Sequence, residues 1–242
     1  MKIAIIGSRG YPSTYGGFET LVRELAPALR DRGHEVVVYG RIQGLKAVES
    51  SVNGVTVRST PTLESKSAST LTNGLTACAD AARKGFDSVL VLNCANGLFL
   101  PLLKLAGIPT MVNVDGLEWK RGKWGRFAQS IFKLGARMSL RFADTLIFDG
   151  HALGEYWRQE FDADGIVISY GATPPTEVND DALYRFSLQS GRYVLVVARL
   201  VPENNLEMLL DAWGRRFADY RLVLVGSTLH GSKLMGRVER FA

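Results

Sequence analysis

The feature that most constrains the fold of this 242-residue chain is a repeated alternation of short apolar segments with segments of helical periodicity. Val, Ile and Leu dominate the short segments, and the longer segments repeat apolar residues every three or four positions. Continuous apolar strands that alternate with helices are typical of a parallel sheet covered by helices on both faces. We therefore predict an α/β fold built on a doubly wound parallel sheet.

The first part of the chain shows this alternation most completely. A strand at 2–7, a helix at 18–32 and a strand at 35–39 make one βαβ unit. Pro27 lies inside that helix, where we expect a kink, and Gly33 ends it. Further strands are expected at 55–59, 88–93, 109–114, 145–148 and 166–169, and further helices at 67–84, 97–106, 127–142 and 151–161.

A change in composition at 171–191 predicts a linker between two domains. It opens with GATPPTEVNDD, in which two prolines are followed by acidic and polar residues. We therefore place an N-terminal domain at 1–170 and a second domain at 192–242. In the second domain we expect strands at 193–197 and 222–225, a helix at 203–213 and a last helical stretch near 232–241.

The second domain is short for its kind. Each half of a doubly wound sheet has about three strands, whereas 192–242 supplies only two. We expect this domain to be truncated, with an unpaired strand edge near 222–225 and sugar transfer near background for the 242-residue chain. A small domain that is complete at this length is the alternative.

Composition limits the class of protein. Hydrophobic residues make up 46% and charged residues 22%, as in globular proteins. No uncharged apolar run approaches the roughly 18 residues of a membrane-spanning helix, and the apolar run before Gly7 is too short for a signal peptide. With only Cys78 and Cys94, a disulfide framework is not expected. We predict a cytoplasmic protein with reduced thiols.

The charge distribution favours anionic partners. Lys and Arg total 29 against 24 Asp and Glu, a formal net charge of +5. The stretch 120–141 carries no acidic residue and holds Lys120, Arg121, Lys123, Arg126, Lys133, Arg137 and Arg141. It is either a solvated helix face or a basic surface that contacts anionic lipid or a diphosphate-linked acceptor, peripherally at the inner membrane face. No nucleic-acid-binding module is recognisable, so no nucleic-acid partner is expected.

A glycine-rich loop follows the first strand and ends in Gly16 and Gly17, directly before a helix. The free N–H groups and the dipole of a helix start favour an anion. The loop is longer than a strand-to-helix turn requires, which favours approach of a phosphate or sugar over a purely structural turn. The dinucleotide fingerprint is absent, because Arg9 and Pro12 replace two of its glycines. Arg41, after the second strand, keeps an NADP-linked oxidoreductase as an alternative.

Four segments resemble family-4 glycosyltransferases of the GT-B fold, and most closely the bacterial rhamnosyltransferase-like subgroup. They are GSRGYPSTYGGFETLVRELAPALRDRGHEVVVY from Gly7, VNVDGLEWKRGKW at 112–124, VISYGA at 167–172 and RLVPENN at 199–205. The resemblance implies two Rossmann-like domains, with the acceptor bound mainly by the first and a nucleotide-diphosphate sugar mainly by the second. It implies no resident cofactor. A non-catalytic fragment that binds sugar or membrane is a further alternative.

The resemblance assigns the donor side residue by residue. Gly16 and Gly17 match the glycine loop that faces the donor phosphates and the transferred sugar. Arg199 matches the arginine that binds the diphosphate, a task that suits a guanidinium. Many relatives have lysine where Asn204 stands, so a second positive charge is missing here. Asn204 and Asn205 can donate hydrogen bonds to the donor or cap the helix that follows.

The acceptor side is assigned to residues at the start of two loops. Asp115 follows the strand at 109–114, where open α/β sheets bind ligands, and relatives often have a histidine near this position. Its carboxylate is either a general base for the acceptor hydroxyl or a turn residue before Gly116. Trp119 offers a flat face for a sugar or packs in the core. The acceptor-binding candidates are Phe18, Glu19, Glu118 and Trp119.

Two further patterns bear on chemistry. The E-x7-E pair of the family is absent, and in relatives it lies beyond the point where this chain stops. Asp162-Ala163-Asp164 matches the metal-binding D-x-D of another glycosyltransferase fold, but it lies between a helix and a strand, where a turn is expected. The three histidines have no metal-ligand spacing. We predict a glycosyltransferase of polysaccharide biosynthesis that holds no metal.

Overall fold

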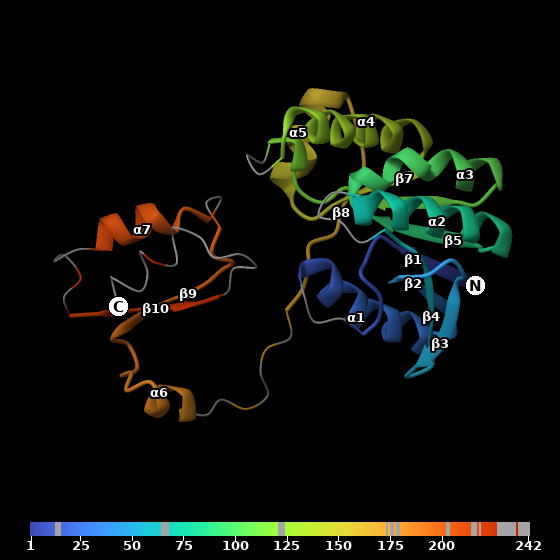
Figure 1. Cartoon of the computed structure of the whole chain (residues 1–242). Helices are drawn as coiled ribbons and strands as arrows, with labels where there is room; N and C mark the ends of the chain where they lie inside the picture. The colour runs from blue at the N-terminus through green and yellow to red at the C-terminus, as the bar shows by residue number, and fades with distance from the viewer. Residues whose placement is uncertain are drawn as a thin grey trace. The chain divides into compact units, whose positions relative to one another are not determined.

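The computed structural model describes residues 1–12, 16–63, 68–120, 124–172, 174, 177, 180–201, 204–213, 217, 219–226 and 236. The chain forms two compact units, Met1–Gly171 and Ala172–Ala242. Each unit is described by itself below. Figure 1 labels their helices and strands.

Unit 1 is built on an eight-stranded sheet with the order β3-β4-β2-β1-β5-β6-β7-β8. All neighbouring strands are parallel except β3 and β4, which confirms the doubly wound parallel sheet. The strands are β1 Lys2–Ile6, β2 Glu35–Ile42, β3 Val48–Val52, β4 Val55–Pro61, β5 Ser88–Leu92, β6 Thr110–Asn113, β7 Thr145–Phe148 and β8 Ile166–Val167.

Strand β3 is absent from the expectations above because its sequence, VESSV, has few apolar residues and it lies exposed at the sheet edge. It pairs with β4 through a two-residue turn. Asn53 and Gly54 both have positive φ, at 50° and 73°, which is the backbone that a tight hairpin requires. The turn residues were therefore a stronger signal for this strand than its apolar pattern.

Helices cover both faces of the sheet (Figure 1). Helix α1 packs on one face, where Val22 and Ala26 join Ile5, Val38 and Leu92 in one core cluster. The larger core on the other face includes residues of α2, α3, α4 and α5. The helices are α1 Gly17–Asp31, α2 Ala68–Lys84, η1 Cys94–Phe99, α3 Leu100–Leu105, η2 Glu118–Lys120, α4 Arg126–Phe142 and α5 His151–Phe161.

The helix expected at 97–106 is instead two elements, the 3₁₀ segment η1 followed by α3. Here two backbones touch. A Cβ atom at Gly97 would collide with the carbonyl oxygen of Gly135 in α4, and one at Gly135 would collide with the carbonyl oxygen of Cys94. Glycine at both positions therefore lets the backbone of α4 approach the backbone of η1 closely.

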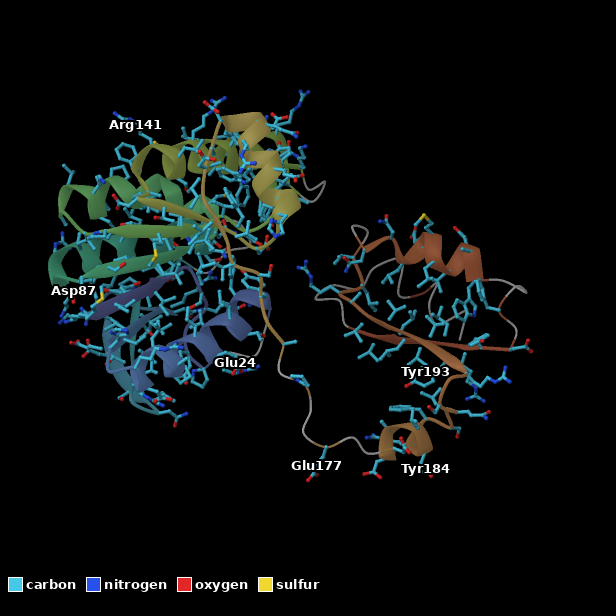
Figure 2. The ribbon with its side chains drawn as sticks, turned by 180° about the vertical axis from the view of Figure 1, so that it is seen from behind. Glu24, Asp87, Arg141, Glu177, Tyr184 and Tyr193 are labelled. Carbon is cyan, nitrogen blue, oxygen red and sulfur yellow. The ribbon has the colours of Figure 1, made fainter. Side chains whose placement is uncertain are left out.

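Unit 2 contains α6 Asp181–Arg185, β9 Tyr193–Val197, α7 Leu206–Trp213 and β10 Arg221–Val225. Helix α6 lies inside the segment that the sequence suggested as a linker, and its Tyr184 is exposed (Figure 2). Strands β9 and β10 are parallel and, within the described part of the chain, pair only with each other. The helical stretch expected near 232–241 lies outside the described residues apart from Gly236.

A polar network ties α2 to the sheet in unit 1. The guanidinium of Arg58 on β4 donates two hydrogen bonds to Asp80 on α2, at 2.5 and 2.7 Å. Tyr39 on β2 donates a third, at 2.9 Å. Burial alone would raise the pKa of Asp80, but the hydrogen bonds from Arg58 and Tyr39 outweigh it and hold that pKa below its usual value. The charged carboxylate therefore stabilises the fold.

We expect Asp80→Asn to lower the free energy of unfolding by about 1–3 kcal/mol at pH 7, because a charged acceptor is lost. The pKa of Asp80 is lowered in the folded state, so its contribution is complete above the unfolded-state pKa near 4 and disappears as pH falls through the folded-state value. Urea titrations at pH 7 and pH 3 measure both effects. The control is Asp164→Asn, whose side chain is 95% exposed. Equal losses in the two variants would contradict the prediction.

Candidate functional site

The topology of unit 1 places a ligand site at the carboxyl ends of its central strands. β1 and β5 are neighbours, and the chain builds the sheet outward from β1 through β2 and from β5 through β6. Open α/β sheets bind ligands where the strand order reverses in this way. The glycine loop after β1 and the loops after β5 and β6 all begin at this edge.

The glycine loop leads directly into α1. Gly16 is the N-cap residue of α1 and has a φ of 105°, a conformation that L-residues with side chains rarely adopt. A Cβ atom on Gly17 would lie 3.7 Å from the ring of Tyr170. The start of α1, where Gly17 has no side chain, therefore lies close to Tyr170, which follows β8.

Two polar residues after β5 and β6 have strained backbones. Asn93 and Asp115 have φ values of 73° and 58°. The Asn93 amide nitrogen donates to a carboxylate oxygen of Asp115 at 3.4 Å, while its amide oxygen accepts from the backbone N–H of Ala95 at 2.9 Å. The second bond fixes which end of the amide faces Asp115. The Asp115 N–H donates to the side chain of Asn113 at 3.1 Å.

Tyr170 completes this group. Burial raises the pKa of its hydroxyl, and the nearby carboxylates of Asp115 and Asp149 raise it further, while a hydrogen bond with Asn113 acts in the opposite direction. The phenol therefore stays protonated near neutral pH and can donate a hydrogen bond. The structure thus brings Gly17, Asp115 and Tyr170 into one neighbourhood.

Asn93, Asn113 and Tyr170 were not among the predicted site residues. Each lies at or near the carboxyl end of a predicted strand. Asn93 closes the strand at 88–93, Asn113 is the penultimate residue of the strand at 109–114, and Tyr170 follows the strand at 166–169. A polar residue at the carboxyl end of a parallel strand was the signal that could have identified them.

Phe18 and Glu19, both predicted to bind the acceptor, face the interior of unit 1. Phe18 packs against the core cluster under α1. Glu19 is buried at 8% exposure, and its carboxylate accepts the backbone N–H of Arg9 at 3.3 Å. These contacts hold the glycine loop in place, so both residues have a structural role in this arrangement.

Glu118 and Trp119 are also buried, at 4% and 5% exposure. Glu118 accepts a hydrogen bond from the indole N–H of Trp124 at 2.7 Å. Trp119 packs edge-on against Trp157 and Phe161, with ring centroids 6.0 and 5.9 Å apart. Its ring faces are therefore largely covered, and the core-packing interpretation describes Trp119 better than an open platform for a sugar.

In unit 2, Arg199 is exposed just beyond the carboxyl end of β9, as predicted. The Asn204 side chain donates to the backbone carbonyl of Arg199 at 2.7 Å, which ties the start of the α7 region to the loop that carries the guanidinium. Asn205 has a φ of 52° and its carbonyl accepts the N–H of Leu209. Helix α7 begins at Leu206, three residues later than expected.

The remaining predicted features lie as follows. Asp162 has a φ of 51° and ends α5, so the D-x-D pattern forms the expected turn. Burial raises the pKa of Cys78 to about 12, which keeps this thiol unreactive near neutral pH.

No helix in the described part of the chain has the length and apolar character needed to cross a membrane. Arg121 and Lys123 of the basic stretch lie outside the described residues.

The fold is that of the GT-B glycosyltransferases. Residues 16–171 match the glycosyl transferase 4-like domain, and the chain belongs to this family. No curated protein matches the chain significantly. Membership of a transferase family sets aside the oxidoreductase alternative. Arg41, on which it rested, donates to Ser69 at 3.4 Å.

Solved structures share the fold. Sucrose-phosphate synthase from Thermosynechococcus elongatus is 17% identical, with a TM-score of 0.74, over 99% of this chain and 67% of that chain. The starch synthase IV catalytic domain from Arabidopsis thaliana, bound to ADP and acarbose, is 14% identical, with a TM-score of 0.66, over 99% and 70%. HepE from Anabaena, in complex with UDP and glucose, is 18% identical, with a TM-score of 0.66, over 99% and 66%.

We expect Glu118→Ala to lower the free energy of unfolding by about 1–3 kcal/mol, because the Trp124 indole loses its acceptor in the interior. Chemical denaturation measures this loss, and Glu155→Ala, an exposed change on α5, is the matched control. A Glu118 variant as stable as the control would instead favour a ligand-binding role for this carboxylate.

Proposed function

We propose that this protein transfers a sugar from a nucleotide-diphosphate donor to a glycan or lipid-linked acceptor in polysaccharide assembly. The observation that carries the proposal is the group of Asn93, Asp115 and Tyr170 at the strand-order reversal of a glycosyltransferase-family domain. Rhamnose is the sugar that the sequence resemblance favours. The structural neighbours that hold ADP or UDP support a nucleotide-linked donor.

In this proposal Asp115 is the general base. It accepts the proton of the acceptor hydroxyl while that oxygen forms a bond to the anomeric carbon of the donor sugar. The bond from that carbon to the diphosphate breaks, and the nucleoside diphosphate leaves with the bonding electrons. Asn93 orients the carboxylate through the 3.4 Å contact, and the protonated Tyr170 can donate to a sugar oxygen.

Phosphate-binding residues for the donor are assigned in each unit by itself: Gly16 and Gly17 in unit 1, and Arg199 in unit 2. Bare N–H groups at the start of α1 and a guanidinium after β9 are both suited to phosphate oxygens. Asn204 supports Arg199 through the carbonyl that it binds. We also propose peripheral contact with anionic membrane through the basic stretch. Figure 2 shows Arg141 of that stretch on α4, and this residue is exposed.

We expect Arg199→Ala to weaken binding of UDP by about 1.5–3 kcal/mol, the range for a charge-assisted hydrogen bond. Isothermal titration calorimetry measures the change. Arg221→Ala is the matched control, because Arg221 is exposed at the amino end of β10, away from the carboxyl end where Arg199 lies. If the Arg199 variant and the wild type bound UDP equally well, Arg199 would not be the residue that binds the diphosphate.

We expect Asp115→Asn to lower the rate of sugar transfer about 10²–10⁴-fold, the usual contribution of a general base. Asparagine tolerates the left-handed backbone at this position, so the loop is expected to keep its shape. Sugar transfer is measured as the rate of product formation, and UDP binding, which should not change, is the control. Undiminished transfer by the variant would exclude Asp115 as the base.

A further inference from the structure

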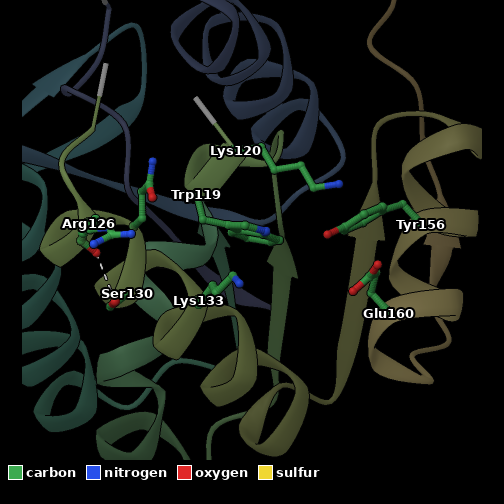
Figure 3. A pocket seen from close by; sticks show the side chains of 8 residues that line it. Trp119, Lys120, Arg126, Ser130, Lys133, Tyr156 and Glu160 are labelled. Atoms are coloured by element: carbon green, nitrogen blue, oxygen red, sulfur yellow. Dashed lines mark hydrogen bonds between the residues drawn. The ribbon is translucent and has the colours of Figure 1, made fainter. Parts of the chain in front are cut away.

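A cavity of about 620 Å³ opens on unit 1 between η2, α4 and α5, separate from the glycine loop (Figure 3). Its polar walls come from one face of α4, where residues three, four and seven positions apart line up. It is lined by Trp119, Lys120, Arg126, Gln129, Ser130, Lys133, Tyr156 and Glu160.

The cavity is rich in positive charge. Lys120, Arg126 and Lys133 contribute three cations against the single carboxylate of Glu160. Among the described residues, neither Arg126 nor Lys133 takes part in an ion pair. The Lys120 ammonium lies 4.2 Å from the centroid of the Tyr156 ring, which holds it at the cavity wall. Among the described lining residues, cationic side chains therefore outnumber carboxylates.

The uncharged part of the lining can support a ligand as well. Ser130 donates to the backbone carbonyl of Arg126 at 3.0 Å, and Gln129 donates to that of Trp124 at 3.1 Å, so both side chains are fixed. The edge of Trp119 and the ring of Tyr156 supply aromatic surface (Figure 3). This mixture of cations, polar groups and aromatic rings suits a phosphate group attached to a sugar or an apolar chain.

We propose that this cavity binds the phosphate or diphosphate group of the acceptor. The inference rests on the proposed glycosyl transfer, to which it adds a class of acceptor. Asp115 and Lys120 belong to the same loop after β6, five positions apart, so their Cα atoms lie within about 18 Å of each other. An acceptor held here by its phosphate can therefore present a hydroxyl toward Asp115.

The cavity is assigned to the acceptor because all of its described lining residues belong to unit 1, whereas the proposed guanidinium for the donor diphosphate belongs to unit 2. The two phosphate sites can thus be tested independently. In an Arg199→Ala background the guanidinium contact is removed, while the start of α1 at Gly16 and Gly17 is kept. The dependence of pyrophosphate binding on Arg126 and Lys133 then reports on the cavity.

The experiment is isothermal titration of pyrophosphate into the 242-residue chain carrying Arg199→Ala. Lys133→Gln and Arg126→Gln are each expected to weaken binding about tenfold. Arg137→Gln removes the same charge from the same helix outside the cavity and is expected to change affinity less than about twofold. Glu160→Gln removes the opposing carboxylate and is expected to tighten binding about threefold.

A second arm separates the sources of the phosphate. If Lys133→Gln also reduces sedimentation with phosphatidylglycerol vesicles, but not the weak binding to phosphatidylcholine vesicles, the phosphate is presented at a lipid surface. If only pyrophosphate binding falls, the phosphate belongs to a soluble acceptor. Either result supports the site.

Three results would overturn the inference: no pyrophosphate binding, equal weakening by Lys133→Gln and Arg137→Gln, or weaker binding after Glu160→Gln. Failure of the proposed function is a different result. It would appear as no binding of UDP by the chain with an intact Arg199.

Discussion

The contact between Gly97 and Gly135 fixes the arrangement on which the rest of unit 1 depends. Because neither residue has a Cβ atom, the backbone of α4 lies directly on η1, the segment that follows β5. The same helix packs Ala136 into the larger core. One face of α4 therefore packs against the backbone of η1. Arg126 and Lys133 of the same helix lie on the wall of the cavity. One close approach thus joins the segment after β5 to the helix that lines the cavity, although the two lie far apart in the sequence.

At the sheet edge, the candidate site uses backbone strain to aim polar groups. Asn93 and Asp115 both adopt the left-handed conformation, which turns each loop sharply after its strand. The amide of Asn93 is then held by the N–H of Ala95, so its donor end faces Asp115. Tyr170 lies near this pair, and its hydroxyl remains protonated because burial and the nearby carboxylates raise its pKa. The hydrogen bond from Asn93 therefore orients the Asp115 carboxylate.

The sequence allowed good prediction of the parallel sheet, because buried strands such as β1 and β5 are continuous apolar runs that periodicity detects. It did not predict β3, whose polar residues lie at an exposed edge. Asp115 was identified from its place after β6, but Tyr170 comes near it only through the strand order, which no local pattern encodes. Trp119 illustrates the opposite error, since an aromatic residue in a ligand-side loop can equally be part of the core.

The fixed position of α4 has a consequence for how specificity can change. One side of the helix packs against η1 so closely that a Cβ atom at Gly97 or Gly135 would collide with the facing backbone, so replacing either glycine would displace the helix. The residues on its other side, among them Arg126 and Lys133, are exposed and make few contacts with the core. Substitutions there alter the shape and charge of the cavity while the helix axis stays in place. The domain can therefore diverge toward new acceptors by exchanging surface side chains on an unchanged frame.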